Sequence, residues 1–230
     1  MNELIVESAR PVTLVGGGQA TPQCLHEALI LAPLCVAVDS GARLVLSERI
    51  ELAALIGDFD SVDGADLARI PEDRQHCIAE QETTDFEKAL MRIAAPVVLG
   101  VGFLGGRLDH QLAALNGLLT FPHRPCILVG LNEIVFLLPP AIDLPTQAGD
   151  TVSLFPLARA RGRGTGLTWP IDDLTLRPGG RVGTSNAATG PVRLEMESPS
   201  LLAILPRRLM QPVVDLFAAP DAARWPAPPG

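Results

Sequence analysis

Two carboxylates one residue apart are the first sign of chemistry in this chain. The stretch LIGDFDSV, residues 55–62, places Asp58 and Asp60 directly after an apolar run and Gly57. Residues i and i+2 of an extended segment point the same way, so the two carboxylates would lie side by side. A cation is the usual reason for such a pair. The alternative is an ordinary turn, because Gly-Asp and Asp-Ser are common turn formers.

Glycine and aspartate recur after five successive strand-like runs. The segments that follow these runs are residues 16–18, 39–41, 57–61, 81–85 and 105–110. In an open parallel sheet, ligands bind at the carboxyl ends of the strands, where such segments would converge. The repetition therefore favours one shared site over five unrelated turns.

The acidic residues of these segments suit a magnesium ion. Mg²⁺ prefers a few carboxylates and keeps its other positions for water and substrate phosphates. Asp58, Asp60 and Asp85 fit that role. Helices that begin at Thr84 and near Asp109 would aim the positive ends of their dipoles at bound phosphate.

Two basic residues could neutralise the charge of a transferred phosphoryl group. Lys88 lies one helical turn beyond Thr84, and Arg107 stands in a glycine-flanked loop. Alternatives are a solvated helix face for Lys88 and a structural salt bridge for Arg107. The glycines at 16–18 match neither the GxGxxG spacing nor GxxxxGK[ST], so they indicate no dinucleotide or P-loop site.

Apolar strands and amphipathic helices alternate through the first part of the chain. Strands are expected at 11–15, 34–38, 52–56, 76–79, 96–101 and 126–130. One helix follows Thr21 as N-cap and Pro22. Another has Thr84 and Glu87 in a capping box, with an apolar side formed by Phe86, Leu90 and Ile93, and a third carries a stripe of Leu108, Leu112, Leu115 and Leu119. This pattern predicts an α/β fold with a mostly parallel sheet and helices on both faces.

Composition changes after about residue 130. Proline and glycine become frequent, and short runs at 133–138, 151–157, 192–196 and 201–206 read as strands of a smaller all-β domain, with Trp169 expected in its core. We therefore expect three parts: residues 1–130, residues 131–218, and a loosely held Pro/Ala-rich tail at 219–230.

Bulk composition excludes several classes of protein. A net charge of -8 argues against a nucleic-acid partner, and no apolar run is long enough to span a membrane. The N-terminal MNELIVESAR carries acids where a signal peptide carries bases, which predicts a cytoplasmic protein. The four cysteines (Cys24, Cys35, Cys77, Cys126) show no CxxC pair, so buried reduced thiols are expected.

Three motifs in a fixed order resemble a known family. GDFDS, TTDFEKAL and GGRLDHQLAAL, with VDSGARL upstream and GLTWPIDDLTLRPGGRVGTSN downstream, are similar to the thiamine pyrophosphokinases (thiamine diphosphokinases). The resemblance covers roughly residues 12–205. It implies a Rossmann-like nucleotide-binding domain followed by a β-sandwich, in a homodimer whose active sites are shared. It also implies pyrophosphoryl transfer from ATP to thiamine with Mg²⁺.

The resemblance also implies roles for individual residues. Asp58, Asp60 and Asp85 would handle metal and phosphate, with Arg107 and Asp109 joining them in catalysis. Nucleotide contacts would come from Gly17, Asp39, Ser61, Thr84, Lys88, Gly106 and Arg107. Thiamine contacts would come from Gln81, Asp109, Ser185 and Asn186, the last two across the dimer interface.

Some positions depart from the family pattern. Glu82 stands where Asp is common, Ala114 where Asn is common, and Ser40 where Gly is common. These departures leave the acceptor open. A diphosphokinase for another hydroxymethyl heterocycle, such as a pterin, and a non-catalytic nucleotide or thiamine sensor are the alternatives.

Overall fold

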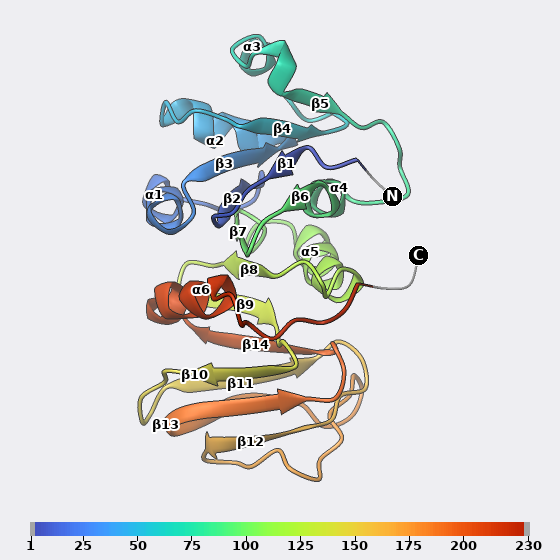
Figure 1. The fold of residues 1–230 in the computed structure, drawn as a ribbon. Coiled ribbons are helices and arrows are strands. Elements are labelled where there is room, and N and C mark those ends of the chain that lie inside the picture. Colours follow the sequence, from blue (N-terminus) through green and yellow to red (C-terminus); the bar gives the residue numbers. More distant parts are fainter. Residues whose placement is uncertain (1–2, 228–230) are drawn as a thin grey trace. The chain divides into compact units, whose positions relative to one another are not determined.

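The computed structural model describes residues 3–227, which form two compact units. Unit 1 runs through Gly117 and also includes Leu128–Leu131. Unit 2 holds Leu118–Ile127 and the residues from Asn132 onward. Figure 1 labels the elements of both units along the chain.

Unit 1 is built on short strands that pair in parallel. They are β2 (Val12–Val15), β3 (Leu34–Val38), β4 (Ala54–Gly57), β5 (Gln75–Cys77) and β7 (Val98–Val101), while β8 (Cys126–Val129) runs into both units. β2 pairs with β7, β3 with β4, and β4 with β5. A separate parallel pair joins β1 (Val6–Glu7) to β6 (Ile93–Ala94).

Helices connect these strands. They are α1 (Pro22–Leu31), α2 (Ala42–Ser47), α3 (Gly64–Leu67), α4 (Asp85–Arg92) and α5 (Leu108–Thr120), with short 3-10 turns η1 (Asp39–Gly41) and η2 (Glu72–Arg74). Thr21 caps α1 by accepting a hydrogen bond from the Cys24 N–H, as the sequence predicted. The capping box between Thr84 and Glu87 at the start of α4 is also confirmed.

The central strands of unit 1, β2, β3, β4 and β7, are buried on both faces, whereas the edge strand β5 is partly exposed. Cys35, Ala37 and Leu55 pack with Leu25 of α1 and Val45 of α2 in one hydrophobic cluster. Val36 of β3 and Ile56 of β4 point to the opposite face and are also fully buried, and α4 contacts both strands. This arrangement explains why β3 and β4 are continuously apolar in sequence.

The leucine stripe of α5 is exposed in its first half and only partly buried at Leu115 and Leu119. Leu108 and Leu112 are 68% and 57% exposed, whereas Ala114 and Leu118 are buried. A Cβ added at Gly117 would lie 2.9 Å from the ring of Phe86, so α5 and α4 approach closely at this point. The close approach requires small residues, which turns the leucines at the start of α5 outward.

Unit 2 is antiparallel. Its elements are β9 (Glu133–Leu137), β10 (Ala141–Leu144), β11 (Thr151–Pro156), β12 (Gly162–Leu167), β13 (Gly183–Met196), β14 (Leu201–Pro206), η3 (Arg207–Leu209) and α6 (Met210–Ala218). β14 pairs with β9 and β11, and the long β13 pairs with β10, β11 and β12. The prediction of an all-β segment missed α6. Pro212 reads as a helix breaker, but it lies in the first turn of α6, where its missing N–H costs nothing.

The largest sheet contains parallel and antiparallel pairs. The architecture is therefore one of mixed sheets with helices, and the parallel pairs named above all lie in unit 1. No helix within residues 3–227 combines the length and the apolar run that a membrane crossing requires.

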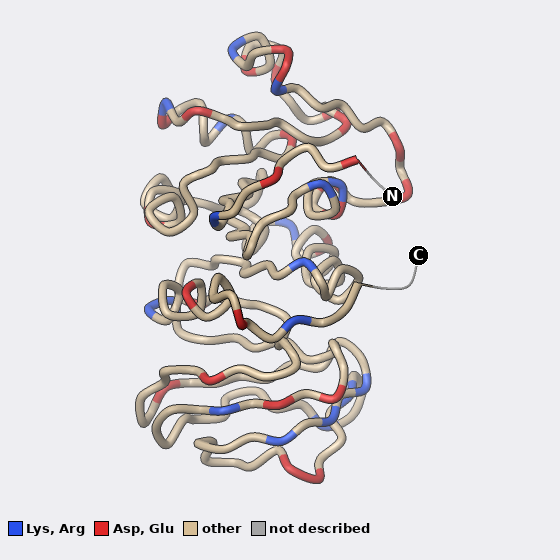
Figure 2. Tube along the Cα trace, in the orientation of Figure 1, with Lys and Arg blue, Asp and Glu red and all other residues tan. Residues whose placement is uncertain are grey.

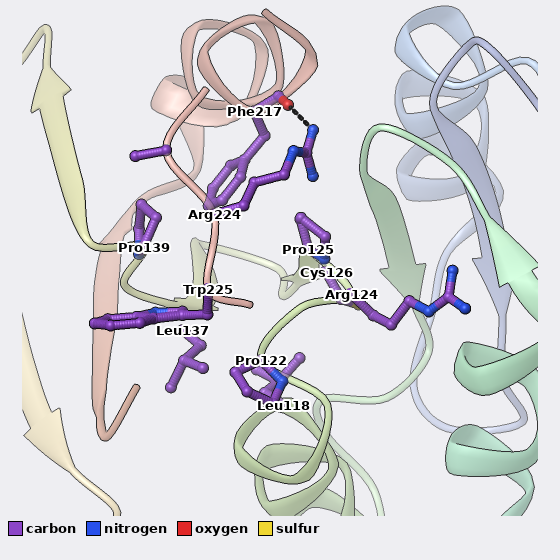
Figure 3. Close-up of a pocket in the computed structure, with 11 residues that line it drawn as sticks. Leu118, Pro122, Arg124, Pro125, Cys126, Leu137, Pro139, Phe217, Arg224 and Trp225 are labelled. Atoms are coloured by element: carbon purple, nitrogen blue, oxygen red, sulfur yellow. Dashed lines mark hydrogen bonds between the residues drawn. The ribbon is translucent and has the colours of Figure 1, made fainter. Parts of the chain in front are cut away.

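The C-terminal tail is docked rather than loose as far as Trp225. The indole Nε1 of Trp225 donates a hydrogen bond to the Leu138 carbonyl at 2.8 Å, and Arg224 donates to the Phe217 carbonyl. Figure 3 shows Trp225 among Leu137, Pro139 and Pro122. The cavity that remains there has a volume of about 10 Å³, room for one water at most. The slot therefore holds the tail and is no ligand pocket.

Candidate active site

Asp39 and Asp58 are brought together by the pairing of two neighbouring strands. Val38 lies opposite Ile56 in the register of β3 and β4, so both chains leave the sheet at the same edge. Asp39 is the first residue after β3, and Asp58 is the first after β4. With Asp60 they offer three carboxylate oxygens that all lie within 4.8 Å of one another.

Gly57 makes room for the Asp39 carboxylate. A Cβ at residue 57 would lie 1.9 Å from Oδ1 of Asp39, so no side chain fits there. Asp39 is itself 5% exposed and has a φ of 44°. Its carboxylate accepts hydrogen bonds from the Phe59 N–H at 3.2 Å and from the Ser61 hydroxyl at 3.4 Å. The GDFDS segment thus wraps around Asp39.

Burial and neighbouring carboxylates make Asp39 hard to ionise. Desolvation, the charge of Asp85 and, more weakly, that of Asp58 raise the pKa of Asp39 to about 7, while the Phe59 N–H opposes the shift. A cation bound between these oxygens would favour the ionised form. The electrostatics of this corner therefore suit a positive ion.

Asp58 is fixed by three donors. Its Oδ2 accepts from Gln81 Nε2 at 3.0 Å and from Lys88 Nζ at 3.2 Å, and its Oδ1 accepts from the Asp60 N–H at 3.2 Å. The hydrogen bond from Gln81, with those from Asp60 and Lys88, lowers the pKa of Asp58. Asp58 is therefore held as a carboxylate in one orientation.

Lys88 is buried rather than on a solvated helix face. It is the one lysine of the 230-residue sequence, and its side chain is 2% exposed. Its ammonium contacts Asp85 Oδ1 at 2.8 Å as well as Asp58. Burial would lower the pKa of Lys88, but the hydrogen bonds to Asp85 and Asp58 outweigh it and raise the pKa. Asp85, predicted as a metal ligand, forms this ion pair and lies outside the closest trio of oxygens.

Arg107 and Asp109 form an exposed pair. Arg107 Nε donates to Asp109 Oδ1 at 3.1 Å, which is the salt bridge weighed as an alternative from the sequence. The hydrogen bond from Arg107 lowers the pKa of Asp109 to about 2. Gly105 and Gly106, just before the pair, both have φ of 80°, a conformation that favours glycine.

The other expected nucleotide contacts lie in unit 1. The Thr84 hydroxyl accepts from the Glu87 N–H as the helix cap, so it already has a structural use. A Cβ at Gly17 would lie 2.0 Å from Ser40 Oγ, which places the 16–18 loop beside the segment after β3. Gly18 N–H donates to the Gly102 carbonyl at 2.8 Å, which ties this loop to the one after β7.

Ser185 and Asn186 belong to unit 2. The Asn186 side chain is buried, donates to the Trp169 carbonyl at 2.7 Å and accepts from the Trp169 N–H at 3.1 Å. Ser185 has a φ of 59°, and its N–H donates to Ser153 Oγ at 2.9 Å. Trp169 is 59% exposed, so the prediction that it lies in the core is wrong. The two hydrogen bonds with Asn186 hold the backbone of Trp169 and leave its indole exposed.

One cysteine reaches the acidic cluster: the Cys77 thiol donates a hydrogen bond to the Asp58 backbone carbonyl at 3.7 Å. Cys24, Cys35 and Cys126 are buried as expected, but Cys77 is exposed, because it ends the short strand β5. Burial raises the pKa of Cys35 to about 12. No disulfide forms among the residues that the structure describes.

Charged side chains also line a second hollow, in unit 2. Figure 2 shows basic and acidic positions among the strands of unit 2, where β12 carries Arg163 and β13 carries Arg193 and Glu195. Arg163 Nε donates to Glu195 at 2.6 Å, and Arg193 Nη1 donates to Asp143 at 2.7 Å. A groove of about 770 Å³ lies beside them, lined in part by Asp172, Asp173, Arg161 and Glu197. These side chains are paired across strands or solvated, as on an ordinary charged sheet surface.

Two family models match adjacent parts of the chain. Residues 25–129 match the thiamin pyrophosphokinase catalytic domain, and residues 141–201 match the thiamin pyrophosphokinase vitamin B1 binding domain. The chain belongs to the thiamine pyrophosphokinase family. The acidic trio, Lys88 and the Arg107–Asp109 pair all lie within the part that matches the catalytic domain.

Related proteins agree with this family. Thiamine pyrophosphokinase 2 of Oryza sativa subsp. japonica is 27% identical over 220 residues, which cover 77% of this chain and 79% of that protein. Thiamine pyrophosphokinase 3 of the same plant is 32% identical over 124 residues, and the match spans 46% of its length. The thiamin pyrophosphokinase structure from Geobacillus thermodenitrificans is 25% identical with a TM-score of 0.71, covering 85% of this chain and 97% of that one.

Proposed function

We propose that this protein is a thiamine diphosphokinase, which transfers a pyrophosphoryl group from ATP to the hydroxyl of thiamine. The products are thiamine diphosphate and AMP. One observation carries the proposal: three carboxylate oxygens, from Asp39, Asp58 and Asp60, lie within 4.8 Å in the segment that matches the catalytic domain of the family. A pure binding protein has little use for carboxylates crowded in this way.

The proposal assigns a task to each part of the chain. Residues 1–130 would form a mostly parallel, Rossmann-like nucleotide and magnesium domain, and residues 131–218 a β-sandwich for thiamine binding and dimerisation. The separate family models for residues 25–129 and 141–201 support this division. The cytoplasmic homodimer expected from the sequence is part of the same proposal, and the absence of disulfides among the described cysteines agrees with a reducing compartment.

The acidic cluster fits Mg²⁺ by its donor set. Asp39, Asp58 and Asp60 offer only oxygen atoms, the ligands that this hard cation prefers. Asp85, expected as a ligand from the sequence, would adjust the charge of the cluster through its ion pair with Lys88. When bound, the ion would neutralise the phosphate charges of ATP.

Lys88 and Arg107 have different tasks in this proposal. Lys88 is buried between two carboxylates, so it fixes their positions and limits their mutual repulsion. Arg107 is exposed and paired with Asp109 alone among the described residues, so its guanidinium can turn to the phosphates when ATP binds. The glycines at 17 and 106 would let the backbone approach the nucleotide, and Ser61 and Thr84 are further proposed nucleotide contacts.

In the proposed reaction the thiamine hydroxyl oxygen bonds to the β-phosphorus of ATP. The bond from that phosphorus to the oxygen of the α-phosphate breaks, AMP leaves with the electron pair, and the hydroxyl releases its proton. Positioning and charge neutralisation supply most of the rate enhancement in such transfers. Asp109 could deprotonate or orient the hydroxyl, but its pKa of about 2 makes it a weak base. Orientation of the hydroxyl is the role that its charge suits.

Thiamine contacts are proposed from Gln81 and Asp109 in unit 1 and from Ser185 and Asn186 in unit 2. Gln81 is exposed beside Asp58, which supports its assignment. The buried Asn186 would act through the backbone that it clasps, with Ser185 as the accessible member of the pair.

Product analysis tests the proposal. The purified protein is incubated with Mg-ATP and either thiamine or 6-hydroxymethyl-dihydropterin, and nucleotides are separated by chromatography. We expect AMP and thiamine diphosphate in equal amounts with thiamine, and no AMP above background with the pterin. AMP formation with the pterin and not with thiamine would show that a pterin is the acceptor. ATP binding without AMP formation from either compound would indicate a non-catalytic sensor.

A further inference from the structure

The loop between β5 and α4 is organised by one side chain, that of Glu80. Its Oε2 accepts hydrogen bonds from the Glu82 N–H at 2.7 Å and from the Thr83 N–H at 3.1 Å. Its Oε1 accepts from the Thr83 hydroxyl. These donors, the Thr83 hydroxyl first, lower the pKa of Glu80, so the carboxylate is charged at neutral pH. One carboxylate thus closes the turn that precedes Thr84 and α4.

This turn carries Gln81 to the acidic cluster. The residue next to Glu80 donates from Nε2 to Asp58 Oδ2 at 3.0 Å, across 23 residues of sequence. Lys88 donates to the same oxygen from the other side of the loop, at 3.2 Å. Gln81 itself is exposed, so packing does not hold its side chain. Its position therefore depends on the shape of the loop.

We propose that Glu80 is a positioning residue for the metal cluster: by closing the 80–84 turn it holds the Gln81 amide on Asp58 Oδ2. Asp58 then keeps its orientation toward Asp39 and Asp60. The inference rests on the proposed function only in that the cluster is taken to bind a divalent cation. Groups that orient a metal ligand in this way change metal affinity or activity by about 10- to 100-fold when they are lost.

Glu80→Gln provides the main test. Glutamine keeps the length of the side chain, but its NH₂ group cannot accept the hydrogen bonds that one carboxylate oxygen accepts. Binding of Mn²⁺ alone is measured by the loss of the free-ion electron paramagnetic resonance signal, with no ATP or thiamine present. We expect the Mn²⁺ dissociation constant to rise about 10-fold or more in Glu80→Gln and Gln81→Ala, and by less than about 3-fold in Glu80→Asp.

A double variant of Glu80 and Gln81 distinguishes a positioning role of Glu80 from a general loss of structure. If Glu80 acts through Gln81, the double variant Glu80→Gln/Gln81→Ala binds Mn²⁺ no more than about 3-fold more weakly than either single variant. Glu72→Gln, the same change on the exposed 3-10 turn η2, is the matched control and should bind as the wild type does. Thr83→Val removes one donor to Glu80 and should shift binding in the same direction.

The possible results are decisive. Wild-type Mn²⁺ affinity in Glu80→Gln, or losses that multiply in the double variant, would overturn the role of Glu80. If Glu80→Gln does not fold, as judged by circular dichroism, Thr83→Val decides in its place. A wild-type protein that binds Mn²⁺ but makes no thiamine diphosphate would refute the proposed function and leave the Mn²⁺ comparison valid.

Discussion

The ammonium nitrogen of Lys88 lies 3.2 Å from Oδ2 of Asp58, although 30 residues separate the two in sequence. The same nitrogen contacts Asp85, so one buried cation joins the segment after β4 to the first turn of α4. Apart from the four histidines, all other basic residues of the chain are arginines, which are bulkier and need more space. The site thus depends on the small ammonium group of Lys88 in a buried position.

Replacing Lys88 tests this dependence. Lys88→Met should lower turnover by about 100-fold or more, because Asp58 and Asp85 then repel each other without compensation. The free energy of unfolding should fall by about 2–3 kcal/mol, less than for a fully buried pair, since Asp85 is partly exposed. Lys88→Arg should also lose activity, because the guanidinium does not fit a side-chain position that is 2% exposed. Urea unfolding and product formation measure both effects. Wild-type activity in Lys88→Arg would contradict the argument from space.

Two glycine-to-alanine variants, one of them a control, test the close approach of Asp39 to Gly57. Gly57→Ala would place its methyl group 1.9 Å from Asp39 Oδ1, so the carboxylate must move and activity should fall at least 10-fold. Gly64→Ala is the control, because nothing lies within 4 Å of that position and it begins the helix α3. The control should keep full activity and gain up to about 1 kcal/mol of stability. Equal activities in the two variants would disprove the steric role of Gly57.

The raised pKa of Asp39 predicts how stability depends on pH in the metal-free protein. Between about pH 4 and its folded pKa of about 7, Asp39 is protonated in the folded chain and ionised in the unfolded chain. The unfolded state then binds fewer protons, so the contribution of Asp39 to the free energy of unfolding decreases as pH rises through this window. Asp39→Asn should remove that decrease. Denaturant titrations with EDTA at several pH values measure the difference between the two proteins, and parallel curves would refute the shift.

Trp225 tests the docking of the C-terminal tail. Trp225→Phe keeps the ring but loses the hydrogen bond to the Leu138 carbonyl, so the free energy of unfolding should fall by about 1 kcal/mol. Trp169→Phe is the control, because that indole is exposed and donates no hydrogen bond that the structure records. Thermal unfolding of the two variants checks the prediction. An unchanged free energy of unfolding in Trp225→Phe would show that the tail is not held by the hydrogen bond of its indole.

Much of the site could be predicted because its residues follow strands. Asp58, Asp60 and Lys88 stand at positions that periodicity and a capping box define, and the structure places them at one corner of unit 1. From the family resemblance, Asp39 is expected to contact the nucleotide rather than the metal. Its place beside Asp58 depends on the register of β3 against β4, which no local pattern records.

Other features depend on contacts that a single sequence does not display. The inward face of α5 is set by the close approach of Phe86 to Gly117, so the leucine stripe does not predict which side of the helix is buried. The helix α6 was hidden by Pro212, and the docked tail by its low-complexity composition. The sequence offers no sign of the role of Glu80, because its three donors lie in its own loop and depend on the backbone conformation there.

The most direct test of the central claim is the product balance of the wild type and of Asp58→Asn, each assayed with thiamine and ATP in the presence of Mg²⁺ and again with EDTA. The account predicts that the wild type forms thiamine diphosphate and AMP in a one-to-one ratio with Mg²⁺ and neither with EDTA. It predicts that Asp58→Asn, folded by circular dichroism, is at least about 100-fold slower. Near-wild-type turnover by Asp58→Asn, or transfer that persists in EDTA, would contradict it.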